Sequence, residues 1–86
     1  MSQVVMYSTG ICPYCTRARM LFEAKGVEFE DIRVDLDPSL RVTMEERSGR
    51  HTVPQIWVGD KHVGGFSDLW ELESRGELDE LLNQNS

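Results

Sequence analysis

The order of three patterns near the N-terminus most strongly constrains how this chain can fold. Residues Val4–Ser8 are rich in β-formers and run into a loop, which predicts a strand. Residues 13–25 suit a helix, and the apolar alternation over residues 27–35 predicts a second strand, although its register slips between Phe29 and Ile32. A strand, helix and strand in this order imply two parallel strands joined by a right-handed crossover.

The middle of the chain predicts a second helix and a hairpin. Asp37 suits the N-cap of that helix, which should end near Gly49 in the left-handed C-terminal position. Two short strands, in residues 54–58 and 61–65, flank a turn at residues 59–60. The hairpin adds two antiparallel strands to the parallel pair.

Two short helices are expected to close the chain. Asp68 with Glu71 three residues later fits a capping box at the start of the first helix. The second helix lies within residues 75–82, and the tail, residues 83–86, should fray. The expected fold is therefore α/β, a single domain over residues 1–86, with helices on both faces of a four-stranded mixed sheet.

Composition narrows the classes of function. The chain has 9 Lys and Arg against 15 Asp and Glu, a net charge of -6, which disfavours nucleic-acid binding. Its apolar runs are too short for a membrane span of about 20 residues. Two cysteines cannot form a multi-bridge framework, and the N-terminus lacks a secretory pattern. We expect a soluble, cytoplasmic protein with no nucleic-acid or membrane partner, acting as a monomer.

Both cysteines, Cys12 and Cys15, lie in one Cys-x-x-Cys pair. Such a pair can be a dithiol redox site, half of a zinc site, or inert core. The spacing of His51 and His62 is poor for completing a zinc site, so no metal is expected. Cys12 falls at a predicted helix start, where backbone N–H groups and the helix dipole stabilise the attacking thiolate. Cys15 should be less exposed, so we expect Cys12 to attack and Cys15 to resolve.

Two further stretches each leave alternatives open. Pro54 either starts a strand or, as a cis proline near Cys12, leaves the Val53 backbone free to bind an extended peptide. Residues 64–65 either form a simple turn before a capped helix or present backbone N–H groups to a carboxylate. Asp68 beside those N–H groups suits the zwitterionic end of an amino acid or peptide.

The stretches "CPYC", "TVPQI" and "GGFSD", at these separations, resemble the glutaredoxin family, in its short, dithiol, bacterial type. The resemblance covers nearly the whole chain. It implies a thioredoxin-like fold, a cis Pro54 facing the cysteines, and glutathione as the reductant, itself restored by glutathione reductase. The implied enzyme is a glutathione-disulfide oxidoreductase that acts on disulfide-containing and glutathionylated proteins, with Cys12 as the nucleophile and Cys15 as its partner.

The resemblance also implies a glutathione site. Thr52 and Val53 bind the glutathione backbone, and Ser67 and Asp68 hold its γ-glutamyl end. Arg50 is expected at the glycyl carboxylate, with Arg47 as the second candidate and a plain surface charge as the alternative for either. The full expected set besides the cysteines is Tyr14, Arg50, Thr52, Val53, Pro54, Ser67 and Asp68.

Two other functions remain as alternatives at this point. One is a redoxin of the same fold that is reduced by thioredoxin reductase. The other is a dimeric iron–sulfur carrier that binds a cluster through one cysteine per subunit plus glutathione. Pro13 and Cys15 disfavour the carrier, because related cluster binders have a smaller residue after the first cysteine. Thr9 stands where many relatives carry a lysine, so the thiolate depends more on the helix terminus.

Overall fold

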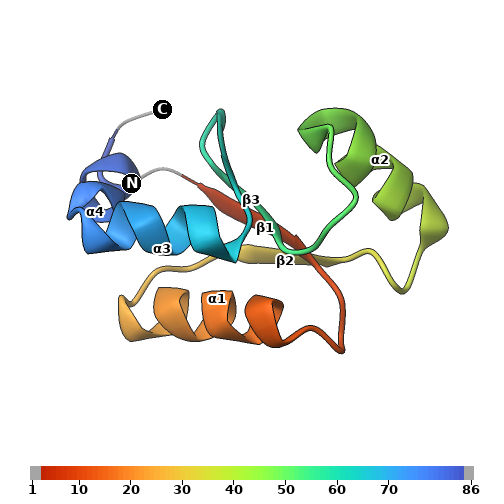
Figure 1. Ribbon diagram of the computed structural model, residues 1–86, viewed down its shortest axis with the longest axis horizontal. Helices are drawn as coiled ribbons and strands as arrows, with labels where there is room; N and C mark the ends of the chain where they lie inside the picture. The colour runs from red at the N-terminus through yellow and green to blue at the C-terminus, as the bar shows by residue number, and fades with distance from the viewer. Residues whose placement is uncertain (1–2, 85–86) are drawn as a thin grey trace.

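The computed structural model describes residues 3–84 and contains eight elements in the order expected from the sequence (Figure 1). The expectation for the end of the tail, residues 85–86, lies outside the described residues. In chain order the elements are β1 (Val4–Ser8), α1 (Pro13–Ala24), β2 (Glu30–Arg33), α2 (Pro38–Ser48), β3 (Gln55–Val58), β4 (Lys61–Gly64), α3 (Phe66–Ser74) and α4 (Glu77–Leu82).

The four strands form one mixed sheet in the order β2-β1-β3-β4. β1 is parallel to β2, whereas β3 is antiparallel to both β1 and β4. Figure 1 shows α1, α3 and α4 on one side of the sheet and α2 on the other. The expected fold class, a four-stranded mixed sheet with helices on both faces, is therefore confirmed.

Alternating side chains of the two central strands build a separate core on each face. Met6 of β1 points to the larger core, where it packs in one cluster with Phe22 of α1 and Leu69 of α3. The next residue, Tyr7, points the opposite way and joins the smaller core with Met44 of α2. Because successive strand residues face opposite sides, one strand anchors helices of both layers.

The second strand is shorter than the sequence predicted, and the difference explains the slip in its apolar pattern. β2 covers only Glu30–Arg33, and the preceding Val27 is bonded through its N–H to Phe22 of α1 (2.9 Å). Phe29 still packs against the α1 side, whereas Ile32 packs against the α2 side. The apolar side chains therefore switch from one side of the sheet to the other at the point where the connection after α1 becomes strand β2.

Helix ends confirm one expected cap and correct another. Asp37 caps α2 by accepting a backbone N–H of the first turn (2.9 Å), and Gly49 ends that helix at φ +70°, as expected. The capping box of α3 was assigned wrongly. Gly65 is the N-cap and Asp68 the third helical residue, because the helix begins directly after β4, at Phe66. The Asp68 carboxylate accepts the Gly65 N–H (2.9 Å).

We expect Met44→Ala to lower the free energy of unfolding by about 2–5 kcal/mol, because Met44 is fully buried between α2 and the sheet. Chemical denaturation followed by circular dichroism measures this loss. Val42→Ala on the same helix is the matched control, since Val42 is 53% exposed and its truncation should change stability by less than about 0.5 kcal/mol. Equal losses in the two variants would contradict the packing described for α2.

Candidate active site

The two cysteines lie at the N-terminus of α1 in unequal environments. Cys12 is the N-cap residue and is half-buried, whereas Cys15, one turn later, is fully buried. The backbone N–H of Cys15 donates to the Cys12 sulfur (3.2 Å). Pro13 occupies the first helical position, where no N–H is needed. This geometry directs a backbone N–H and the positive end of the helix dipole at Cys12, where both stabilise a thiolate.

Burial sets Cys15 apart chemically as well. Removal from water, followed by the neighbouring Cys12 sulfur, raises the pKa of the Cys15 thiol to about 12. Nearby Arg19 and the Thr9 backbone oppose this shift without cancelling it. Cys15 is therefore a protonated thiol at neutral pH, and Cys12 is the sulfur placed for attack.

The loop before β3 faces the cysteine pair, although it lies 41 residues along the chain. The Val53–Pro54 peptide bond is cis, as the family resemblance implied. The Cys12 thiol donates to the Val53 carbonyl at 3.7 Å. Pro54 is buried, Val53 is half-buried and Thr52 is exposed. The loop therefore places the Val53 carbonyl, with the exposed Thr52 before it, at the reactive sulfur.

A hollow of about 330 Å³ lies beside this loop. It contains all seven non-cysteine residues of the site expected from the sequence, although they come from α1, from α3 and from the loop before β3. Gly65, which the sequence left open between a simple turn and a carboxylate-binding site, also lines it, as does Phe66, to which the sequence assigned no role. The lining is Tyr14, Arg50, Thr52, Val53, Pro54, Gly65, Phe66, Ser67 and Asp68.

The hollow carries an ion pair at the N-terminus of α3. Arg50 lies 3.1 Å from the Asp68 carboxylate, and both side chains are nearly half exposed. The Gly65 N–H, followed by Arg50, holds the pKa of Asp68 below its usual range, so this carboxylate is charged at neutral pH. Gly64, at φ +116°, permits this arrangement, because a Cβ there would clash with the Asp68 carboxylate. The site thus presents both a cation and an anion.

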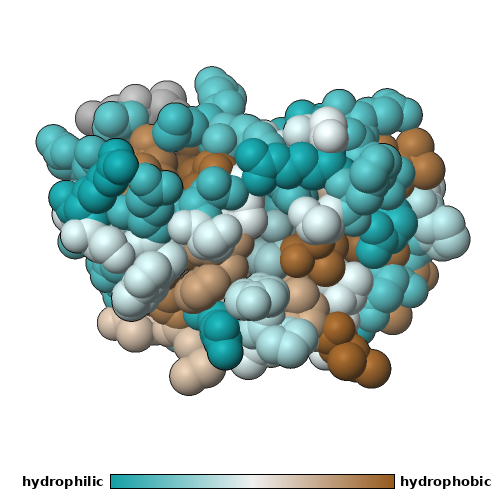
Figure 2. All heavy atoms as spheres, in the orientation of Figure 1, coloured by the Kyte–Doolittle hydropathy of each residue, from teal (hydrophilic) through white to brown (hydrophobic). Residues whose placement is uncertain are grey.

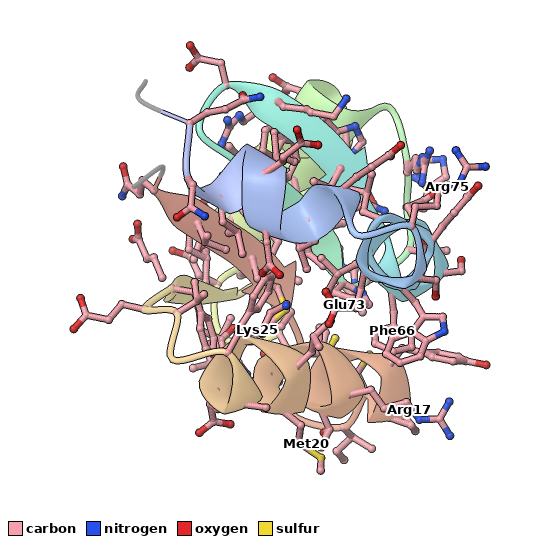
Figure 3. All side chains as sticks on the ribbon, turned by 90° about the vertical axis from the view of Figure 1, so that its left-hand side faces the viewer. Arg17, Met20, Lys25, Phe66, Glu73 and Arg75 are labelled. Atoms are coloured by element: carbon pink, nitrogen blue, oxygen red, sulfur yellow. The ribbon has the colours of Figure 1, made fainter. Side chains whose placement is uncertain are left out.

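Aromatic rings extend the wall of the hollow. Tyr14 stacks against Phe66 with ring centroids 6.2 Å apart, and Phe66 stacks against the exposed Trp70 at 6.3 Å. The Arg17 guanidinium lies 5.3 Å from the Tyr14 ring. Figure 3 shows Arg17 projecting from α1 on the same side as Phe66 of α3. Phe66, left unassigned by the sequence, therefore holds the Tyr14 ring beside the cysteines.

Figure 2 shows a face that is largely hydrophilic, on which several hydrophobic groups are exposed, one of them over the loop between β1 and α1. Ile11 in this loop is 97% exposed and directly precedes Cys12. A fully exposed apolar side chain therefore stands directly before the first cysteine.

The sequence did not single out Gln55, which lies behind the hollow. It is a fully buried polar side chain in β3, directly after Pro54, and its amide contacts Thr52 and His62. One signal in the sequence could have identified Gln55: it is the single amide within the apolar run "PQIWV". A polar side chain that is buried in such a strand needs hydrogen-bond partners.

The described part of the chain contains neither a cluster of metal-ligating side chains nor a helix that could span a membrane. Among residues 3–84, no cluster of three or more His, Cys, Asp or Glu side chains is placed to hold a metal ion. No helix in that range is long and apolar enough to cross a membrane.

A half-exposed thiol at a helix N-terminus and a buried thiol one turn later are the parts that dithiol exchange requires. Together with the four-stranded mixed sheet and its flanking helices, these two thiols identify the chain as a thiol–disulfide oxidoreductase of thioredoxin-like fold. The sequence model of the glutaredoxin family matches residues 4–63, and a Pseudomonas aeruginosa glutaredoxin is 51% identical over 83 residues, which cover 96% of this chain and 99% of that protein. The chain belongs to the glutaredoxin family.

Solved structures agree with this assignment. The Brucella melitensis glutaredoxin, determined in solution, superposes with a TM-score of 0.84 at 51% identity, covering 95% of this chain and 89% of that one. The crystal structure of a buckwheat glutaredoxin–glutathione complex superposes with a TM-score of 0.87 at 28% identity, covering 94% of this chain and 76% of that one. The thioredoxin-like fold is therefore confirmed.

We expect iodoacetamide to modify Cys12 alone when it is added to the native, reduced protein at pH 7 to 9. Cys15 is buried and its pKa is about 12, so its labelling should rise only as the pH approaches that value. Peptide mapping by mass spectrometry measures the two sites separately. Denatured protein is the control, in which both thiols should react, and equal labelling in the native protein would contradict the asymmetry.

Proposed function

We propose that this chain is a glutathione-dependent reductase of protein disulfides and of protein–glutathione mixed disulfides. The observation that carries the proposal is the hollow beside Cys12, which joins the exposed Thr52 and the half-buried Val53 to the Arg50–Asp68 ion pair. Its partners are glutathione and disulfide-containing or glutathionylated proteins, with glutathione reductase acting indirectly by restoring glutathione.

The hollow complements each part of glutathione. The Thr52 and Val53 backbone suits the extended peptide, with its sulfur towards Cys12. The Asp68 carboxylate suits the α-ammonium of the γ-glutamyl group, and the N-terminal turn of α3 at Ser67 suits its carboxylate. The buckwheat glutaredoxin solved with glutathione supports this ligand.

Arg50 suits the glycyl carboxylate, although it now pairs with Asp68. Because both side chains are nearly half exposed, the pair is worth only about 0–1 kcal/mol. A ligand carboxylate can therefore compete for the Arg50 guanidinium at little cost, and Asp68 is then available to an ammonium group.

Removal of glutathione from a protein needs Cys12 alone. The Cys12 thiolate attacks the glutathione sulfur of the mixed disulfide, a new disulfide forms between Cys12 and glutathione, and the protein thiolate leaves and takes up a proton. A second glutathione thiolate then attacks the glutathione sulfur bound to Cys12. Oxidised glutathione leaves, and the Cys12 thiolate is restored.

Reduction of a protein disulfide needs both cysteines. Cys12 attacks one sulfur and forms a mixed disulfide with the protein, releasing the first protein thiol. Cys15 then gives up its proton and attacks the Cys12 sulfur, which releases the second protein thiol and leaves a Cys12–Cys15 disulfide. Two glutathione molecules reduce this disulfide.

The two cysteines should therefore respond differently to substitution. Cys12→Ser should abolish turnover of a glutathionylated peptide, whereas Cys15→Ser should retain it and lose most reduction of a protein disulfide. NADPH consumption in the presence of glutathione and glutathione reductase measures both reactions. Equal loss in the two variants would overturn the assigned roles. Turnover with thioredoxin reductase in place of glutathione and its reductase would overturn the choice of electron donor.

Asp68→Asn should raise the KM for a glutathionylated peptide about tenfold, because the ammonium group loses its anionic partner. Asparagine keeps an oxygen that can accept the Gly65 N–H, so the start of α3 is preserved. The matched substrate carries deaminated glutathione, for which wild type and variant should have similar KM values. The same tenfold change on both substrates would show that Asp68 does not bind the ammonium group.

A further inference from the structure

A chain of side-chain contacts lies behind the proposed glutathione hollow. The Gln55 amide nitrogen donates to the Thr52 carbonyl (3.0 Å) and to the Thr52 hydroxyl oxygen (3.2 Å). The Gln55 amide oxygen lies 2.8 Å from Nε2 of His62, on β4. Gln55 is fully buried, so its amide depends on these partners.

The Thr52 carbonyl fixes the orientation of this chain. A carbonyl oxygen can only accept a hydrogen bond, so the Gln55 nitrogen must face Thr52 and the Gln55 oxygen must face His62. Nε2 of His62 therefore carries a hydrogen and donates it to Gln55. Protonation of the ring would leave this hydrogen in place. The hydrogen bonds from His62 to Gln55 and from Gln55 to Thr52 therefore run in the same direction whether His62 is neutral or charged.

Aromatic packing holds His62 at its end of the chain. The imidazole stacks on Trp57, its cross-strand neighbour, with ring centroids 4.5 Å apart. The Arg47 guanidinium of α2 lies 4.5 Å from the Trp57 ring and donates to the Tyr7 hydroxyl (2.9 Å). Burial, followed by the charge of Arg50, lowers the pKa of His62, so the stacked ring is neutral at neutral pH.

Both hydrogen bonds from Gln55 act on Thr52. One holds the Thr52 carbonyl towards Gln55, and the other occupies a lone pair of its hydroxyl, whose own hydrogen stays available to donate. The next carbonyl, that of Val53, contacts the Cys12 thiol. The direction of the Thr52–Val53 backbone therefore depends on the Gln55 amide.

We propose that Gln55, oriented by His62, is a positioning residue that sets the Thr52–Val53 backbone for binding the peptide part of glutathione. This inference rests on the proposed function. It assigns selectivity for glutathione partly to two side chains, Gln55 and His62, neither of which lines the hollow.

The test compares one peptide whose cysteine carries either glutathione or cysteamine in a mixed disulfide. Cysteamine lacks the γ-glutamyl and glycyl groups, so it cannot use the Thr52–Val53 backbone. Wild type is measured first, and a higher kcat/KM for the glutathione form is expected. If wild type shows no preference, the proposed function fails, and the inference about Gln55 fails with it.

If wild type prefers the glutathione form, Gln55→Glu should reduce the ratio of the two kcat/KM values about tenfold, mainly through a higher KM for the glutathione form. The ionised carboxylate has the same shape and can still accept from His62, but it cannot donate to Thr52. Gln55→Leu removes the donor without adding a charge and should show the same loss. An unchanged ratio in folded variants, or an equal fall on both substrates, would overturn the positioning role.

The His62 variants decide the matter if the Gln55 variants do not fold. His62→Phe can keep the stack on Trp57 but loses the N–H, and it should lower the preference for the glutathione form. His62→Gln supplies an N–H donor again and should recover most of it. Equal preferences in the two His62 variants would count against the chain from His62 to Thr52.

Discussion

The antiparallel pairing of β1 with β3 is the constraint on which the site depends. Its register places Tyr7 opposite Gln55, so the end of β1 and the start of β3 lie at the same edge of the sheet. The loop from β1 then carries Cys12, and the loop into β3 carries Pro54. Residues that are 41 positions apart meet there because two buried strands are fixed in register. The cores on the two faces hold that register in place.

The same strand pairing gives the cysteines their unequal chemistry. Because α1 starts at the sheet edge and packs across one face, its N-cap residue Cys12 remains partly exposed and Cys15, one turn later, enters the core. Burial raises the pKa of the Cys15 thiol, while a backbone N–H at the helix N-terminus points at the Cys12 sulfur. The proposed order of attack and resolution follows from where the helix begins.

The sequence predicted the element order, the cysteine asymmetry and the residues that meet in the hollow, because each has a local or motif signal. It did not predict the length of β2, because the apolar residues on both sides of the slip between Phe29 and Ile32 were assigned to one strand, whereas they face opposite sides of the sheet. Nor did it find Gln55 and His62. Their contact depends on the register of the β3–β4 hairpin, which is irregular between Ile56 and Trp57, and no periodic pattern encodes such a shift.

The hollow combines a fixed wall with exchangeable charges. Behind the wall, Gln55 is buried and its amide is hydrogen-bonded, so breaking its contacts with Thr52 would leave polar groups unsatisfied. At the rim, Arg50 and Asp68 are nearly half exposed, and each can leave the other for a ligand group at small cost. In the proposed function, glutathione must bind, react and leave in every cycle, and this division suits that requirement. A fixed wall suits recognition of the peptide part, and a weak ion pair suits exchange of the charged groups.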